Sequence, residues 1–164
     1  MIREDAGSVS GDIRGVLVQV KGGRLLLPNA SVSEVLSYAD PEPMAGVPDW
    51  ILGRIRWRGW QLPLVAWARL TGTAADEAGD LGSKVAVVKA LHGNPRLPYF
   101  AVLAQGFPRL VTVSRDALLT DAGEGQPLPE AALAGVLLNE DRAMIPDLDG
   151  IATQIDMALQ QAQL

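Results

Sequence analysis

Cysteine is absent from the 164-residue chain, and histidine occurs once, at His92. This scarcity excludes thiol nucleophiles, any Ser-His-Asp triad not built on His92, and nearly every zinc or haem site. His92 lies in LHGNP, which reads as a turn, so we expect an exposed loop histidine and not a general base. The glycine pairs also lack the strand–loop–helix spacing of phosphate cradles. The sequence therefore predicts a protein that has no catalytic activity, no metal and no cofactor.

Long apolar runs and an excess of basic residues are absent as well. No stretch approaches the roughly 20 apolar residues of a membrane span, and the first residues lack the apolar core of a signal peptide. The net charge is −5, which disfavours nucleic-acid binding through overall charge. Apolar residues make up 48% of the chain and charged residues 20%, as in folded globular proteins. We expect a cytoplasmic protein with no membrane insertion and no nucleic-acid partner.

What the chain does contain is a series of short apolar runs separated by 17 Gly and 11 Pro residues. This pattern is typical of an antiparallel β-barrel or sandwich. Ser31 and Glu34 have the spacing of a capping box, which predicts a short helix through Ser37. The spacing of Ile151 and Ile155 predicts an amphipathic helix over residues 151–164. We expect a mainly β protein with short helices and a C-terminal helix.

The two halves of the chain show a faint similarity to each other. Residues 15–36 and 99–119 both read as strand, hairpin, strand and a short helix that carries a carboxylate. The similarity suggests two related lobes. The acidic, glycine-rich stretch 73–82 is then the expected crossing between them, and residues 121–129 are expected to form a second mobile loop.

Residues 48–70 stand apart, because this segment holds all four Trp residues together with several Arg residues. On a strand, Ile55 and Trp57 would face the core, while the arginines face the other way. Arg58 and Gly59 would form the hairpin turn. The arginine stripe can be a solvated face, a contact with an acidic partner, or a single-stranded nucleic-acid platform with Trp stacking. In an acidic protein, a local protein contact is favoured. The stripe consists of Arg54, Arg56 and Arg58.

At this segment the sequence resembles the CheW-like family of chemotaxis coupling proteins. The resemblance covers about residues 14–152, and the order of its motifs is more specific than any one of them. The chain departs from the family at Arg56-Trp57, where the family commonly has Asn-Leu, and at residues 67–69, where it often has Asp-Leu-Arg. Such departures resemble the accessory coupling proteins of pilus-associated systems. The matching residues are Glu34-Val35, MAGVP (44–48), Trp50, Gly53, Arg58-Gly59, Pro63, YFAVLAQGFPRLVTVSRDAL (99–118) and AGVLLNEDRAMIPDLDGI (134–151).

The resemblance implies one domain of two interlocked, SH3-like, five-stranded β-barrels over residues 14–152. Its first lobe would span about residues 22–72, and its second lobe about residues 84–150 together with the first strand. Residues 1–13 would be a flexible N-terminus and 153–164 a C-terminal helix. The implied function is a non-enzymatic adaptor between the cytoplasmic tip of a chemoreceptor and the regulatory domain of a CheA-like histidine kinase. The implied partner-binding residues are Val32, Glu34, Val35, Arg58 and Gly59.

Two alternatives remain open from the sequence alone. Glu34 could close a helix capping box instead of contacting a partner. The whole chain could also be a small β-barrel binding module that uses the Trp/Arg hairpin, residues 54–69, for a ligand or single-stranded nucleic acid.

Overall fold

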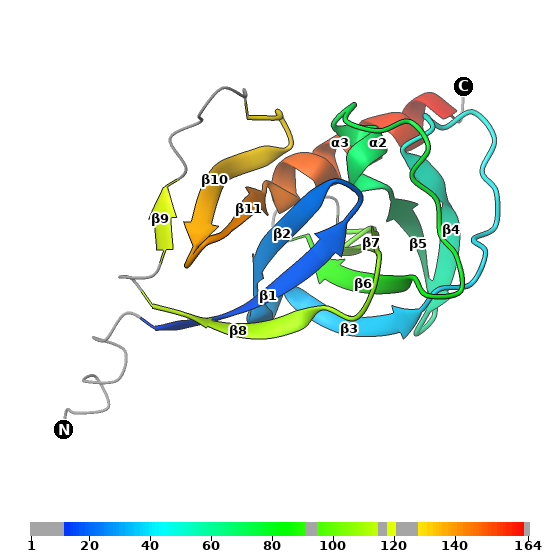
Figure 1. Ribbon diagram of the computed structural model, residues 1–164. Coiled ribbons are helices and arrows are strands. Elements are labelled where there is room, and N and C mark those ends of the chain that lie inside the picture. The colour runs from blue at the N-terminus through cyan, green and yellow to red at the C-terminus, as the bar shows by residue number, and fades with distance from the viewer. Residues whose placement is uncertain (1–11, 91–94, 115–117, 121–127, 163–164) are drawn as a thin grey trace.

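The computed structural model describes residues 12–90, 95–114, 118–120 and 128–162. Over these ranges the protein consists of two β-sheets and a C-terminal helix, α3 (Leu148–Ala162), which packs against both of them (Figure 1). The prediction of a mainly β protein with a C-terminal helix is confirmed, and the helix begins at Leu148 instead of Ile151.

The first sheet has six strands, one more than the five expected for a lobe. They are β1 (Ile13–Val20), β2 (Gly23–Pro28), β8 (Arg109–Val113), β9 (Leu118–Thr120), β10 (Ala132–Leu138) and β11 (Asp141–Pro146). Their order across the sheet is β8-β1-β2-β11-β10-β9. All neighbours pair antiparallel except β2 and β11, which run parallel.

The second sheet has five strands in the order β3-β6-β7-β5-β4, so β3 and β4 form its two edges. Among these, β5 and β7 pair in parallel and the other neighbours are antiparallel. A short helix, α2 (Trp67–Leu70), follows the sheet's third strand in sequence. The strands are β3 (Val32–Ser37), β4 (Ile51–Trp57), β5 (Trp60–Val65), β6 (Lys84–Lys89) and β7 (Tyr99–Ala104).

The main hydrophobic core lies between the two sheets and is covered by α3. Val18 of β1, Phe100 of β7 and Ile155 of α3 all belong to this central cluster. The opposite faces of the same sheets hold smaller clusters, which include Leu17 in the first sheet and Leu103 in the second. Because β7 and residues 16–18 of β1 are buried on both faces, these stretches are continuously apolar instead of alternating.

The chain crosses between the sheets twice, and neither crossing lies in the predicted stretch 73–82. It passes from the first sheet to the second at the 3₁₀ turn η1 (Asn29–Ser31) and returns between β7 and β8. The predicted hairpin within residues 99–119 is therefore wrong, since β7 pairs with β5 and β6, and β8 pairs with β1. The predicted similarity between the two halves of the chain depended on that hairpin, so the structure does not support it.

The helix predicted from Ser31 through Ser37 is also wrong. These residues form the end of η1 and then β3, which pairs antiparallel with β6. Leu36 lies opposite Val85, and the register shifts once between Val32 and Glu34. Pairing with a buried strand across the fold has outweighed the local helix signal.

The sheets also divide the chain at other positions than the lobe limits 22–72 and 84–150. The second sheet is one continuous stretch from Val32 to Ala104, whereas the first sheet combines strands from both ends of the chain. His92, residues 1–11 and residues 121–127 lie outside the described residues. In the part that the structure describes, no helix is long and apolar enough to cross a membrane.

Candidate partner-binding surface

The turn between β4 and β5 carries two of the residues expected to bind a partner, Arg58 and Gly59. Trp57 pairs with Trp60 across this turn, which confirms the predicted hairpin. Both turn residues have positive φ, 50° at Arg58 and 83° at Gly59. Two such residues make the type I′ turn, whose twist matches that of the strands it joins. A Cβ on Gly59 would meet no atom within 4 Å, so the backbone conformation and not crowding favours glycine here.

Glu34 of β3 meets this turn through its carboxylate. Its Oε1 atom accepts a hydrogen bond from the Trp57 indole Nε1, at 2.9 Å, and forms an ion pair with the Arg58 guanidinium at 3.0 Å. The guanidinium carbon of Arg58 also lies 5.0 Å from the centre of the Trp57 ring. The capping-box interpretation of Glu34 is wrong, because β3 contains no helix to cap. The structure instead brings Glu34, Arg58 and Gly59 together.

The two valines expected in the site differ in exposure. Val35 lies opposite Ala86 of the central cluster and is itself 36% exposed. It therefore stands at the margin of the space between the sheets. Val32 is half-buried and packs against the central cluster. Val35 is thus available to a partner, whereas Val32 mainly supports the core.

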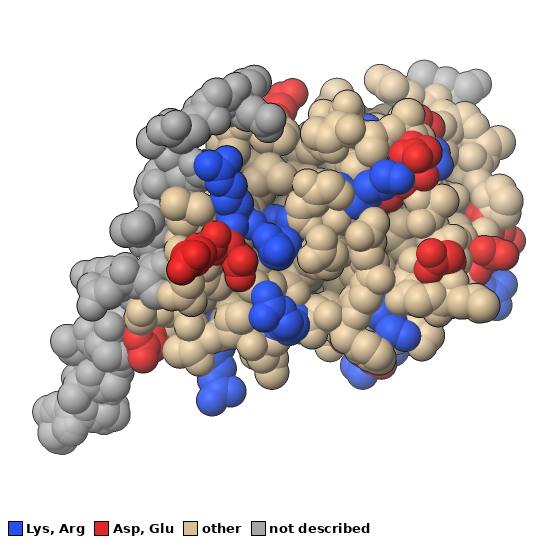
Figure 2. All heavy atoms as spheres, viewed as in Figure 1, with Lys and Arg blue, Asp and Glu red and all other residues tan. Residues whose placement is uncertain are grey.

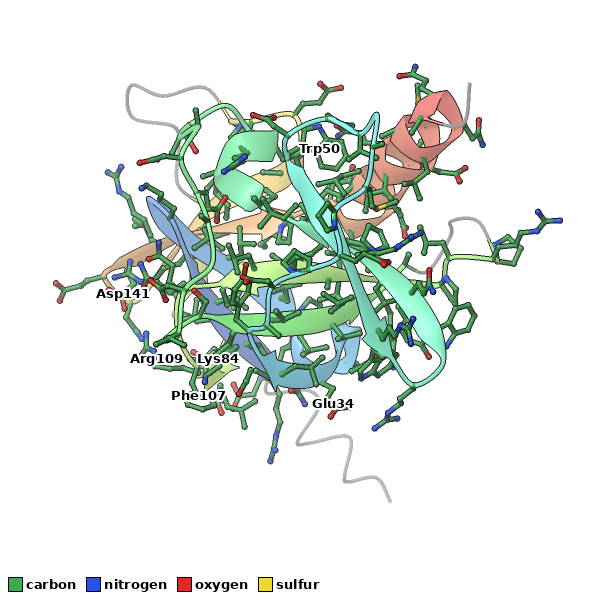
Figure 3. All side chains as sticks on the ribbon, turned by 90° about the vertical axis from the view of Figure 1, so that its right-hand side faces the viewer. Glu34, Trp50, Lys84, Phe107, Arg109 and Asp141 are labelled. Carbon is green, nitrogen blue, oxygen red and sulfur yellow. The ribbon has the colours of Figure 1, made fainter. Side chains whose placement is uncertain are left out.

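Three further residues at this margin were missed by the sequence analysis. Leu110 of β8 lies opposite Val16 of the central cluster and is 70% exposed, while Phe107, in the second crossing, is 76% exposed. Lys84 of β6 holds its ammonium 4.3 Å from the Phe107 ring centre, and the two lie together in Figure 3. We call Val35, Lys84, Phe107 and Leu110 the inter-sheet margin. The only sequence signal was a large aromatic residue between Gly106 and Pro108.

The hairpin that carries the arginine stripe offers little surface for base stacking. Of its three Trp residues, Trp57 is only 7% exposed and Trp67 is buried, so neither ring is open to a base, and Trp60 is half-buried. The prediction that Trp57 is a core residue is confirmed. Arg54 forms an ion pair with Glu42, in which Nε lies 2.6 Å from Oε1. Arg56 is exposed. Figure 2 shows basic side chains interspersed with acidic ones on the face it presents. These observations disfavour the nucleic-acid interpretation.

A buried carboxyl group with a raised pKa lies away from this surface. Glu77 is 2% exposed and accepts a hydrogen bond from the Ala68 backbone N–H at 2.7 Å, at the start of α2. Burial raises the pKa of Glu77 above the ordinary glutamate value. Its contacts are with backbone groups, which indicates a structural role. No group of three or more potential metal-binding residues occurs in the described ranges.

Comparisons with known proteins agree with this architecture. Residues 14–156 match the family model of the CheW-like domain. The structure is similar to that of the scaffolding protein TtCheW from Thermoanaerobacter tengcongensis, with a TM-score of 0.67 and 13% sequence identity. The match covers 82% of this chain and 83% of that protein. The family match and the structural match confirm the predicted two-lobed, SH3-like fold. No curated protein sequence matches the chain significantly.

Proposed function

The chain belongs to the CheW-like domain family, and from this membership we propose that it is a non-enzymatic adaptor in a chemosensory array. It would couple the cytoplasmic tip of a chemoreceptor to the regulatory domain of a CheA-like histidine kinase, on the cytoplasmic side of the membrane. The departures at Arg56-Trp57 and at residues 67–69 favour the accessory type found in pilus-associated systems.

The observation that carries this proposal is the solvent-facing Glu34–Arg58 ion pair, one residue along β3 from the exposed Val35 of the inter-sheet margin. A contiguous exposed apolar patch bordered by polar groups is typical of a protein-binding surface. Val35, Phe107 and Leu110 supply the apolar part, and Lys84 and the ion pair supply charge. This composition suits a helical receptor tip with apolar side chains and polar flanks.

A ternary pull-down tests the proposal. Purified receptor-tip fragment, kinase regulatory domain and the wild-type chain are expected to be recovered together. Arg58→Glu places a carboxylate beside Glu34 and removes a cation from the surface, so it is expected to abolish recovery. Arg56→Glu is the matched control, because Arg56 is an exposed arginine on β4 outside the site, and this variant is expected to bind normally. Equal recovery with both variants would contradict the role of Arg58.

A salt titration separates this function from the nucleic-acid alternative. Binding of single-stranded DNA weakens steeply as salt is raised. A largely apolar contact with a receptor responds little. Measurable DNA binding that vanishes between about 50 and 200 mM salt, a range over which phosphate-dependent affinity falls by several orders of magnitude, would favour the alternative instead.

A further inference from the structure

Trp57 takes part in the contact between Glu34 and Arg58, although it is a core residue. β3 and β4 are the opposite edges of the second sheet, with three strands between them, so no backbone ladder joins them at this point. A groove of about 310 Å³ lies between the two edges, lined by Leu36, Ile55 and Val85 among others. At Glu34 the two edges are linked by side chains, through the Trp57 indole N–H and the Arg58 guanidinium.

The position of the Trp57 ring is fixed by its surroundings. It packs in a small cluster with Leu62 and Val87, and the Tyr99 ring meets it edge-on with the ring centres 4.9 Å apart. The indole can therefore move little, and its N–H is presented at a constant place. A buried indole N–H needs an acceptor, and the acceptor here is the Glu34 carboxylate.

This arrangement fixes the two charged side chains as well. Glu34 Oε1 is held by two donors, and Arg58 is held by the carboxylate on one side and by the Trp57 ring on the other. The Arg58 side chain is 69% exposed and the Glu34 side chain 38%, so both still face solvent. Side chains that are ordered before association do not lose that freedom on binding.

We propose that Trp57 is a positioning residue for partner binding, in addition to being part of the core. Its indole N–H orients the Glu34 carboxylate and, through it, the Arg58 guanidinium, so that the partner meets a preformed pair. This inference rests on the proposed adaptor function, since the partner it concerns is the receptor tip. Removing the N–H releases two long side chains, which corresponds to a loss of affinity on the order of tenfold.

The test compares two variants in the same hydrophobic cluster. Trp57→Phe keeps an aromatic ring and removes the N–H, whereas Val87→Ala removes packing and keeps the N–H. Affinity for a purified receptor-tip fragment is measured by calorimetry, and the stability of each variant by thermal melting. We expect Trp57→Phe to bind about tenfold more weakly and Val87→Ala to bind like the wild type despite its lower stability. Normal binding by Trp57→Phe would overturn the proposal.

A double-mutant cycle shows whether Trp57 acts through Glu34. In a Glu34→Ala background, Trp57→Phe should cause no further loss of affinity, because the acceptor is already gone. A loss of the same size in both backgrounds would mean that Trp57 acts only through packing, and the proposal would fail.

A third measurement needs no partner. The indole N–H resonance of Trp57 in the unbound protein should shift in Glu34→Ala and stay in place in Arg56→Ala. An unchanged resonance in Glu34→Ala would refute the positioning role directly. If the wild type bound no receptor-tip fragment, the adaptor function would fail, while this measurement would still decide whether Trp57 positions Glu34.

Discussion

Arg58 occupies a backbone conformation that arginine rarely adopts, which makes its replacement by asparagine informative. With φ of 50°, it is one of two residues other than glycine with positive φ among those described. Asparagine tolerates this conformation much better than most residues. Arg58→Asn therefore removes the guanidinium from the surface and relieves the turn at the same time.

The expected change in stability is small because the contributions oppose each other. A left-handed conformation costs an ordinary residue about 1–2 kcal/mol, and asparagine would recover part of this. Against it stand the ion pair with Glu34, worth about 0.2–1 kcal/mol for such exposed groups, and the contact with the Trp57 ring, worth about 0.5–1 kcal/mol. We expect the free energy of unfolding to change by less than about 1 kcal/mol, which is about 2–4 °C in Tm at this size.

The expected change in binding is much larger. If the partner buries Arg58 in a hydrogen-bonded charge pair, truncating this side chain costs about 2–5 kcal/mol, and the lower figure is roughly a thirtyfold loss of affinity. The assay is calorimetry with the receptor-tip fragment, beside a thermal melt of the same sample. Arg56→Asn is the control, since it removes an exposed arginine of the same strand outside the turn. Unchanged affinity in Arg58→Asn, or a melt lowered by much more than stated, would refute the reasoning.

Three other substitutions test separate features. Val35→Asp should lower the melting temperature only modestly, because the side chain is 36% exposed at the margin, yet lose receptor binding in the pull-down; retained binding would remove the inter-sheet margin from the site. Gly53→Ala should lower the melting temperature, because a Cβ there would collide with the Glu42 carbonyl oxygen that pairs with β4; an unchanged melt would contradict this. The pKa of Glu77 is raised by burial, so its contribution to stability is greatest at acid pH and falls as the pH rises above the ordinary glutamate range. In Glu77→Gln the amide oxygen can still accept from the Ala68 N–H, but the side chain does not ionise, so the free energy of unfolding should fall less as the pH rises. Urea unfolding of both proteins at pH 5 and pH 8 measures this difference.

Most strands could be predicted from the sequence because a buried strand appears as a short apolar stretch. β7 and residues 16–18 of β1 are apolar throughout, since both faces are covered there, and Gly22 supports the turn between β1 and β2 with a φ of 80°. The errors came from pairing across the fold. Residues 31–37 carry a valid local helix signal, but β6 makes a strand of them. Likewise, nothing near Gly106 shows that the chain leaves one sheet there and enters the other.

The binding surface could be predicted only in part, for the same reason. Glu34, Val35 and Arg58 came from the resemblance to a family, and the structure places them near one another. The hydrogen bond between Glu34 and Trp57 joins opposite edges of a sheet, so no local pattern contains it. The unusual Trp57 was visible as a departure from the family, but its acceptor was not. Phe107 was hidden because its exposure depends on where the second crossing runs.

The two crossings also determine the order in which the protein can assemble while it is being synthesised. The hairpin of β1 and β2 is synthesised before the second sheet, but its neighbours β8 and β11 are made only after that whole sheet, residues 32–104. An isolated two-stranded hairpin is at best marginally stable, so Val16 and Leu17 lack their final neighbours on both faces during this interval. The second sheet can pair completely in the meantime. A chain released after residue 104 would therefore carry all five strands of the second sheet together with an isolated β1–β2 hairpin. It would have no α3 to cover the core between them.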